Sequence, residues 1–225
     1  MKHKLSPVIV AVLLVIPLFN CQKSMEPTAM KPVAKDAVSA AGQALKTFPA
    51  MIDEENFKAM GFKSVSEARQ AKLGQPIKVF MVRLDHLSKY EPGTPPDSLL
   101  DTTTSQVIFP LTVDNEARCA ITVSLRNEQW VVTRFGSPNL TKLVSSARQA
   151  SMKMTELPPS AYSIVRVPAL NMVFVAYQDK DTNELMLTPT LDNPNLEMKA
   201  GSSMPATEVF NKLVPLAQGH SGLPT

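Results

Sequence analysis

From Pro76 onward the chain is built of short runs rich in β-branched and other apolar residues, and this pattern constrains its fold most strongly. The first runs are IKVFMVRL, VIFPLTV, ARCAITVSL and WVVTRF. Such runs, separated by turn-forming residues, predict the strands of a sheet. They are followed by SPNLTKLVSSARQ, which predicts a helix with Ser137 as its N-cap and Pro138 at its first position. Helices packed on an antiparallel sheet define the α+β class, which is therefore the expected fold class.

The β-rich region also resembles itself in the order of its segments. Residues 107–125 align with residues 172–191, and LTKLVSSA aligns with FNKLVPLA after a shared Gly-Ser and Pro. Internal similarity of this kind is typical of a repeated structural unit. The sequence thus predicts two similar halves, each a short antiparallel sheet with a helix packed on it, preceded by N-terminal helices. Chance agreement is the alternative. The arrangement resembles the architecture of cystatin-like and PepSY-like modules, with no PepSY motif residue present.

Helical segments are expected before the first strand. Residues 36–47 carry an apolar stripe, a second helical piece is expected over 52–60, and SVSEARQAKLG has a capping box formed by Ser64 and Glu67. The predicted division of the chain is a signal peptide (1–20), a tether (21–35), N-terminal helices (36–75), a first α+β half (76–152) and a second α+β half with a short C-terminal tail (153–225).

The N-terminus has the features of an export signal. Lys2 and Lys4 precede an apolar run over residues 5–19, shorter than the roughly 20 apolar residues that span a bilayer. The run ends in LFNC, which resembles the lipobox of bacterial lipoproteins, with Asn20 where that family usually has Gly, Ala or Ser. The resemblance implies that Cys21 is lipidated and anchors the protein to a membrane.

Two localisations follow from this N-terminus. In the proteobacterial sorting rule, Asp after the lipidated cysteine retains a lipoprotein at the inner membrane, and Gln22 occupies that position here. The resemblance therefore implies a cell-envelope lipoprotein, anchored in the outer membrane and facing the periplasm. The alternative is an ordinary secretory signal cut within residues 23–29, which would leave a secreted, soluble protein.

Charge and cysteine content narrow the partners and the chemistry. The chain has 23 basic and 20 acidic residues, and this near-balance argues against nucleic acid as a partner. Only two cysteines are present, so lipid on Cys21 would leave Cys119 without a disulfide partner. Cys119 alternates with apolar residues in ARCAITVSL and is expected to face the core as an inert thiol.

No catalytic or cofactor-binding motif is found along the chain. His86 follows Asp85 at the expected end of a strand, where neighbouring side chains point to opposite faces, and His220 lies in the C-terminal tail. Residues 179–183 copy the start of a calcium loop, but the sixth position is Glu184 instead of Gly, so a hairpin turn is expected. No catalytic residue, metal site or cofactor is therefore predicted. Trp130 is expected to pack in the core.

Arginines within apolar strands are the most unusual polar residues of this sequence. Arg83, Arg134 and Arg166 each require an acidic partner or an open groove. If they meet on one concave face, they could bind an anionic ligand. A long loop is expected over residues 88–106 and could act as a lid over such a site.

Two functional hypotheses remain open. Segments such as GFKSVSEARQAKLGQPIKVF resemble secreted bacterial proteins without assigned activity. The first hypothesis is a non-enzymatic, membrane-anchored lipoprotein that serves as a protein-interaction or envelope-assembly module, with an envelope protein of unknown identity as its partner. The second is a small-ligand-binding protein on the periplasmic side, which uses the strand arginines. An enzyme ranks third, because no nucleophile and base are paired.

Overall fold

The computed structural model describes residues 32–220 of the chain, with the side chain of Thr104 left out. Within these residues nine strands form one sheet in the order β5-β4-β3-β2-β6-β7-β8-β9, and β1 pairs with β3 outside this path. The strands are β1 (Lys72–Leu73), β2 (Ile77–Val82), β3 (Leu100–Val113), β4 (Glu116–Arg126), β5 (Gln129–Gly136), β6 (Ser163–Val167), β7 (Met172–Gln178), β8 (Leu185–Pro189) and β9 (Met204–Pro205).

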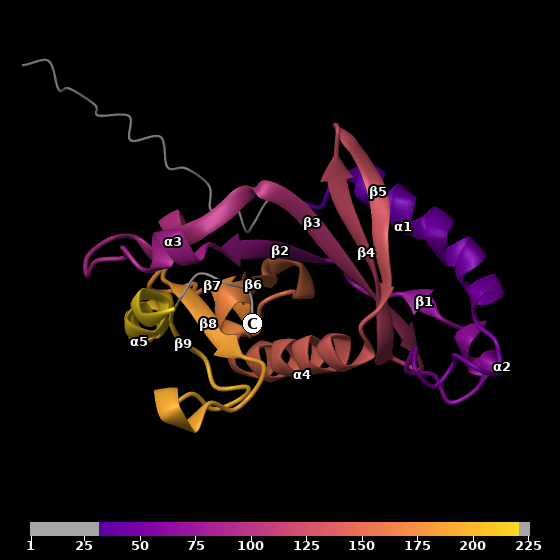
Figure 1. Ribbon diagram of the computed structural model, residues 1–225. Helices are drawn as coiled ribbons and strands as arrows, with labels where there is room; N and C mark the ends of the chain where they lie inside the picture. The colour runs from indigo at the N-terminus through magenta and orange to yellow at the C-terminus, as the bar shows by residue number, and fades with distance from the viewer. Residues whose placement is uncertain (1–31, 221–225) are drawn as a thin grey trace, which may run out of the picture.

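Helices cover both faces of this sheet (Figure 1). The α-helices are α1 (Lys35–Thr47), α2 (Val65–Ala68), α3 (Leu84–Leu87), α4 (Pro138–Thr155) and α5 (Ala206–Gly219). Short 3₁₀ helices are η2 (Phe48–Met51), η3 (Pro96–Leu99), η4 (Pro159–Ala161), η5 (Pro168–Leu170) and η6 (Pro194–Leu196). The fold is therefore α+β, as the sequence predicts.

The sheet is mixed because of a single junction. Strand β2 pairs in parallel with β6, where Phe80 lies opposite Val165, and every other pairing in the sheet is antiparallel. The sequence left open whether the β-rich segments form one sheet or two. The β2–β6 pair joins them into one continuous sheet.

Successive side chains of each strand point to opposite faces of the sheet and pack in separate hydrophobic cores. On β3, Val107 and Phe109 pack in a cluster with Ala41 of α1, whereas Ile108 packs in a cluster with Val144 of α4. Helices α1 and α4 consequently lie on opposite sides of β3, β4 and β5 (Figure 1). Helix α5 packs on the same face as α1, against β8 and β9. We call these sides the α1 face and the α4 face.

Two helices expected near the N-terminus are not formed as predicted. The stretch 52–60 is a series of turns, and the helix expected from Ser64 to Gly74 stops after Ala68 at the end of α2. The capping box itself is confirmed, since the backbone N–H of Glu67 donates to Ser64 Oγ at 3.0 Å. The following residues instead form β1, because pairing with Leu111 and Thr112 of β3 outweighs the local helical preference.

The long loop expected over residues 88–106 is also wrong. It contains η3, and β3 begins at Leu100, where it pairs with Val82 of β2. The threonine-rich segment of β3 extends the sheet beyond its apolar part, so no long lid covers a site. Ser137 is not a side-chain cap either: it adopts φ 57°, and its carbonyl accepts hydrogen bonds from the Thr141 N–H and hydroxyl.

Candidate functional site

A cavity of about 290 Å³ opens on the α4 face between the sheet and the first turns of α4. Strands β2, β3, β4, β5 and β6 all contribute to its wall. One side of the lining is polar: Gln106, Thr122, Ser124, Arg126, Thr133, Arg134 and Arg166. The other side is mainly apolar: Ile77, Met81, Ile108, Leu140, Val144 and Ile164. The cavity is thus divided into a polar and an apolar region.

Three arginines give the polar region a positive charge. Arg134 lies on β5 opposite Thr122, Arg166 lies on β6, and Arg126 ends β4. Among residues 32–220, none of these guanidinium groups has a carboxylate oxygen within 4.0 Å, and the cavity lining contains no Asp or Glu. The positive charge of the cavity therefore has no balancing charge within its own walls.

Arg166 is the least favourably placed of the three cations. Burial, and secondly the charge of nearby Arg134, lower the pKa of Arg166 below its ordinary value. Its Nε atom is buried and lacks a hydrogen-bond acceptor in the part of the chain that the structure describes. A buried donor of this kind costs stability unless water or a ligand satisfies it. Arg166 is consequently primed to bind an anionic acceptor.

The neutral polar residues of the cavity are held in a fixed row. Gln106 Nε2 donates to Ser124 Oγ at 3.3 Å, and the hydroxyls of Ser124 and Thr133 lie 3.1 Å apart. The Thr133 hydroxyl also lies 3.3 Å from the Thr122 carbonyl, to which it donates. These contacts join β3, β4 and β5 across the sheet. The row keeps hydrogen-bonding groups at defined positions beside the arginines.

The apolar region is part of the protein core. Ile77, Ile108 and Ile164 from three neighbouring strands are buried and pack in one cluster with Val144 of α4. Leu140, in the first turn of α4, packs against the same cluster. Because core side chains are tightly packed, this wall changes shape little when a ligand enters. The cavity therefore presents a rigid apolar surface next to a cationic one.

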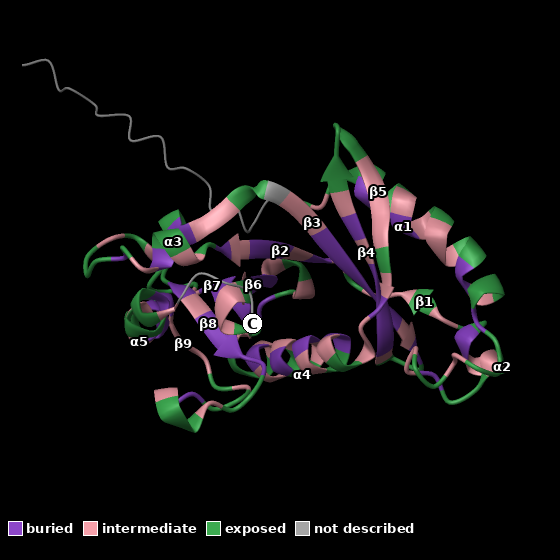
Figure 2. Cartoon of the chain, in the orientation of Figure 1, coloured by how far each residue is buried: buried purple, intermediate pink, exposed green. Residues whose placement is uncertain are grey.

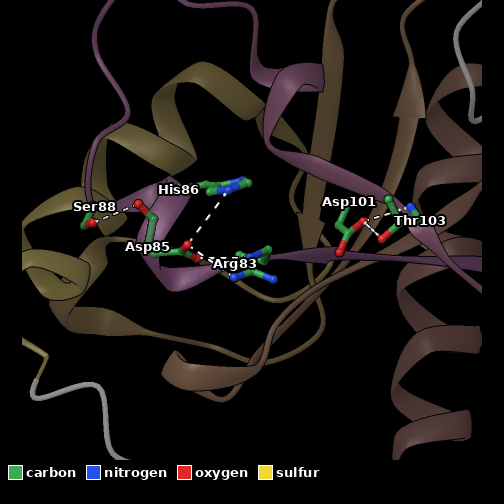
Figure 3. Close-up of polar contacts among 6 residues, drawn as sticks. All are labelled: Arg83, Asp85, His86, Ser88, Asp101 and Thr103. Carbon is green, nitrogen blue, oxygen red and sulfur yellow. Dashed lines mark hydrogen bonds and ion pairs between the residues drawn. The ribbon is translucent and has the colours of Figure 1, made fainter.

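The structure brings together two of the three arginines that the sequence singled out. Arg134 and Arg166 line the cavity from strands that are not neighbours in the sheet. Arg83 does not join them: it precedes α3, its side chain is 58% exposed, and its Nε donates to Asp85 Oδ1 at 3.1 Å (Figure 3). Asp85 in turn raises the pKa of Arg83 through that hydrogen bond. The condition that all three meet on one face is therefore not fulfilled: Arg134 and Arg166 line the cavity, and Arg83 does not.

Arg126 is the cavity residue that the sequence reasoning missed. It is the exposed last residue of β4 and is followed by the β4–β5 turn, where Figure 2 shows the hairpin tip as exposed. The signal was the strand alternation, because Thr122, Ser124 and Arg126 follow one another at every second position. That period places Arg126 at the mouth of the cavity.

The histidine beside Asp85 offers no catalytic arrangement. His86 and Asp85 lie together in the short helix α3, with His86 Nε2 3.9 Å from Asp85 Oδ2 and both side chains 55% exposed (Figure 3). Ser88 reaches only the Asp85 backbone carbonyl, at 3.3 Å. Neither hydroxyl nor imidazole faces a cavity wall. His220 follows the end of α5.

The turn expected over residues 179–183 is confirmed and joins β7 to β8. One carboxylate oxygen of Asp179 accepts the backbone N–H groups of Asp181 and Thr182, both at 3.0 Å. The acidic oxygen thus stabilises the turn itself. In residues 32–220, no group of three or more His, Cys, Asp or Glu side chains is arranged to hold a metal ion.

The expectation that Cys119 faces the core is confirmed. Its side chain is fully buried in the cluster beneath α1, and this burial raises the pKa of the thiol to about 12. A thiol that stays protonated at neutral pH is a poor nucleophile. Trp130 also packs against this cluster, as predicted. Cys21 lies outside the described residues.

Replacing Cys119 by Ala should make stability less sensitive to alkaline pH. The raised pKa means that the folded protein keeps this proton while the unfolded chain loses it near pH 9, so the wild type loses stability as pH rises from 9 towards 12. Cys119→Ala should therefore cost about 1 kcal/mol at pH 7, and most of that deficit should vanish by about pH 10. Urea unfolding of both proteins in reductant at pH 7, 9 and 10 measures the difference, and a deficit that stays constant contradicts it.

Comparison with known proteins gives no relative: no family matches the chain, and neither a curated protein nor a solved structure shows significant similarity. Within residues 32–220, no helix combines the length and the apolar character needed to cross a membrane.

Proposed function

We propose that this chain is a non-enzymatic binding protein of the bacterial cell envelope that holds a small anionic ligand in the arginine-lined cavity. The observation that carries this proposal is the uncompensated charge of Arg134 and Arg166 on a partly enclosed cavity wall. Arg134 is exposed to solvent, whereas Arg166 is half-buried, so the unpaired charge of Arg166 is the one that reduces folding stability. Such a local cost is expected at binding sites, where a ligand supplies the missing charge.

Binding is favoured over catalysis by the lining of the cavity. It contains arginines, hydroxyls, one amide and apolar side chains, with no His, Cys, Asp or Glu among the described lining residues. Arginine stays protonated in proteins and does not exchange protons with a substrate at neutral pH. The arrangement can therefore hold and orient an anion, but it has no group suited to general base catalysis.

Protein contact or envelope assembly is less well supported. That function would be expected to use a continuous exposed apolar patch. The exposed large apolar side chains instead come from α1, η2, β4, α4, α5 and the segment after β8: Val38, Met51, Leu125, Met154, Leu191 and Leu216. We therefore prefer ligand binding to a protein-interaction module as the main function.

We further propose that the two halves, 76–152 and 153–225, arose by internal duplication. Apart from η3 and η6, which do not correspond, the order β2-α3-β3-β4-β5-α4 matches β6-η5-β7-β8-β9-α5. A twofold axis that runs along the parallel β2–β6 junction would exchange the two faces of the sheet. Helices α4 and α5, which follow the two sets of strands, do lie on opposite faces. The duplication would explain why Arg134 comes from one half and Arg166 from the other.

Removing both cavity arginines should abolish anion binding without harming the fold. In the Arg134→Gln/Arg166→Gln protein, anions that raise the melting temperature of the wild type should have no effect. The ligand-free variant should be as stable as the wild type or up to about 1 kcal/mol more stable, because the repulsion between the two cations is gone. Thermal unfolding with benzoate, phenyl sulfate and phenyl phosphate measures both effects.

Arg83→Gln is the matched control for this experiment, because it removes an arginine that is exposed and lies outside the cavity. It should leave anion binding unchanged. Equal stabilisation of the wild type and the double variant by every anion would refute the proposed site.

The location of this site in the cell is a separate proposal. We propose that Cys21 carries lipid and holds the protein at the outer membrane, on the periplasmic side, with a secreted soluble protein as the alternative. The support is the lipobox-like LFNC sequence and the Gln22 that follows it. No cofactor and no nucleic acid partner are proposed.

Cys21→Ser should convert the membrane-bound protein into an unprocessed precursor. Without the thiol no lipid can be attached, and the lipid-dependent cleavage before residue 21 cannot follow. Metabolic labelling with radioactive palmitate, combined with membrane fractionation, should show label on the wild type and none on the variant. Processing and membrane attachment that persist in Cys21→Ser would exclude the anchor and favour secretion.

A further inference from the structure

The charges that line the cavity indicate how many negative charges its ligand carries. This inference rests on the proposed binding function. Arg134 and Arg166 are close enough to interact electrostatically, and no acidic residue of the lining offsets them. A ligand with one negative charge would leave an excess of positive charge between these two groups. A ligand that carries two negative charges balances these two groups and removes their mutual repulsion, while the exposed Arg126 remains in contact with solvent.

The arrangement of the charged residues indicates that both negative charges lie on one chemical group. The arginines are gathered on β4, β5 and β6, whereas the part of the cavity near α4 has no cation and is lined mainly by Ile77, Leu140 and Val144. Ser137 and Thr141 are the polar residues there, and the Thr141 hydroxyl already donates to the Ser137 carbonyl. A dicarboxylate would place its second charge towards that apolar wall, where burying a charge without a partner is costly. A phosphate group concentrates both charges and offers three terminal oxygens to the arginine donors.

The apolar wall and the volume of the cavity indicate the polarity and size of the remainder of the ligand. Rigid side chains of the core cluster lie next to the arginines, so an apolar body attached to the phosphate would bury its surface there. The volume of about 290 Å³ is at the lower end of the range for small-molecule pockets, roughly 300–1,000 Å³. A long acyl chain or a dinucleotide would not be enclosed, whereas an aromatic ring or a short alkyl group would be.

We infer that the cavity binds a compact organic phosphate monoester. Its phosphate lies between Arg134 and Arg166, and its apolar body packs on Ile108 and Ile164.

Phenyl phosphate and phenyl sulfate test this inference, because they share size and shape but differ in charge above about pH 6, where the phosphate loses its second proton. The whole mature protein, in detergent, is titrated with each ligand by calorimetry between pH 5 and pH 8. Phenyl phosphate should bind roughly tenfold tighter than phenyl sulfate at pH 8, and the two should converge at pH 5. The arginines are the only charged groups of the lining, so phenyl sulfate should bind equally at all these pH values.

Inorganic phosphate serves as a third probe and should bind at least roughly tenfold more weakly than phenyl phosphate, because it has no apolar body to bury. Equal affinity of those two ligands would overturn the assignment of the apolar wall.

The outcomes separate this inference from the proposed function. If phenyl sulfate and phenyl phosphate bind equally at pH 8, and Arg134→Gln/Arg166→Gln abolishes both, the anion site stands and the phosphate monoester is wrong. If no probe binds to the wild type at millimolar concentration, both the inference and the proposed function fail. In every case Arg83→Gln should behave as the wild type does.

Discussion

Gly61→Ala should lower the free energy of unfolding by roughly 3 kcal/mol, which for a domain of this size is a fall in melting temperature of roughly 10 °C. Gly61 has a φ of 86°, which an L-residue adopts only with strain. An added Cβ would lie 2.5 Å from the carbonyl oxygen of Arg118 and 2.8 Å from Cβ of Pro138. Relief would require β4 or the start of α4 to move away.

Gly93→Ala separates the two causes of this loss. Gly93 has a similar φ of 91°, but an added Cβ would meet no atom within 4 Å. Its substitution should therefore cost only the backbone strain, about 1 kcal/mol. Urea unfolding of the two variants gives the comparison. Equal losses would mean that the close approach at Gly61 does not contribute.

Glu67→Ala should cost about 3 kcal/mol, because it leaves a buried charge without its buried counterion. The side chain of Arg118 is only 9% exposed, and its Nη2 atom lies 2.7 Å from Glu67 Oε1. Glu67 Oε2 also accepts a hydrogen bond from the backbone N–H of Lys63, just before the N-terminus of α2. The loss should be measured by chemical unfolding at neutral pH.

Glu116→Ala is the matched control, since Glu116 pairs with the same guanidinium at 2.7 Å but is 64% exposed. Exposed ion pairs contribute little, so this variant should lose less than about 1 kcal/mol. Adding Arg118→Met to Glu67→Ala should recover part of the lost stability, because it removes the buried charge that has kept only its exposed partner, Glu116. If Glu67→Ala and Glu116→Ala cost the same, burial of the pair is not what gives it its strength.

Local patterns were sufficient to predict much of the fold. The alternation in ARCAITVSL predicted both a strand and the inward direction of Cys119, and the helix that begins at Pro138 is α4. These features depend on residues close together in sequence, whose periodicity is visible without a partner. The α+β class follows from the same periods.

Long-range pairing decided what the sequence could not predict. The residues after α2 form β1 because β3 lies beside them, and β3 begins at residue 100 because Leu100 and Asp101 pair with β2. The candidate site could not be predicted for the same reason. Arg134 and Arg166 line one cavity because the pairing of β2 with β6 joins the two sets of strands in one sheet, and no local pattern contains that pairing.

The parallel junction of β2 with β6 also determines when the sheet can be completed during folding. All antiparallel neighbours from β3 to β5 are joined by short turns, whereas β6 begins 81 residues after β2 ends, as the bounds of Ile77–Val82 and Ser163–Val167 show. Until β6 arrives, β2 is an open edge that could pair with another chain. A non-local contact of this kind forms slowly. The strand order therefore makes the first half of the chain vulnerable to aggregation during synthesis or export, and the docking of β6 ends that vulnerability.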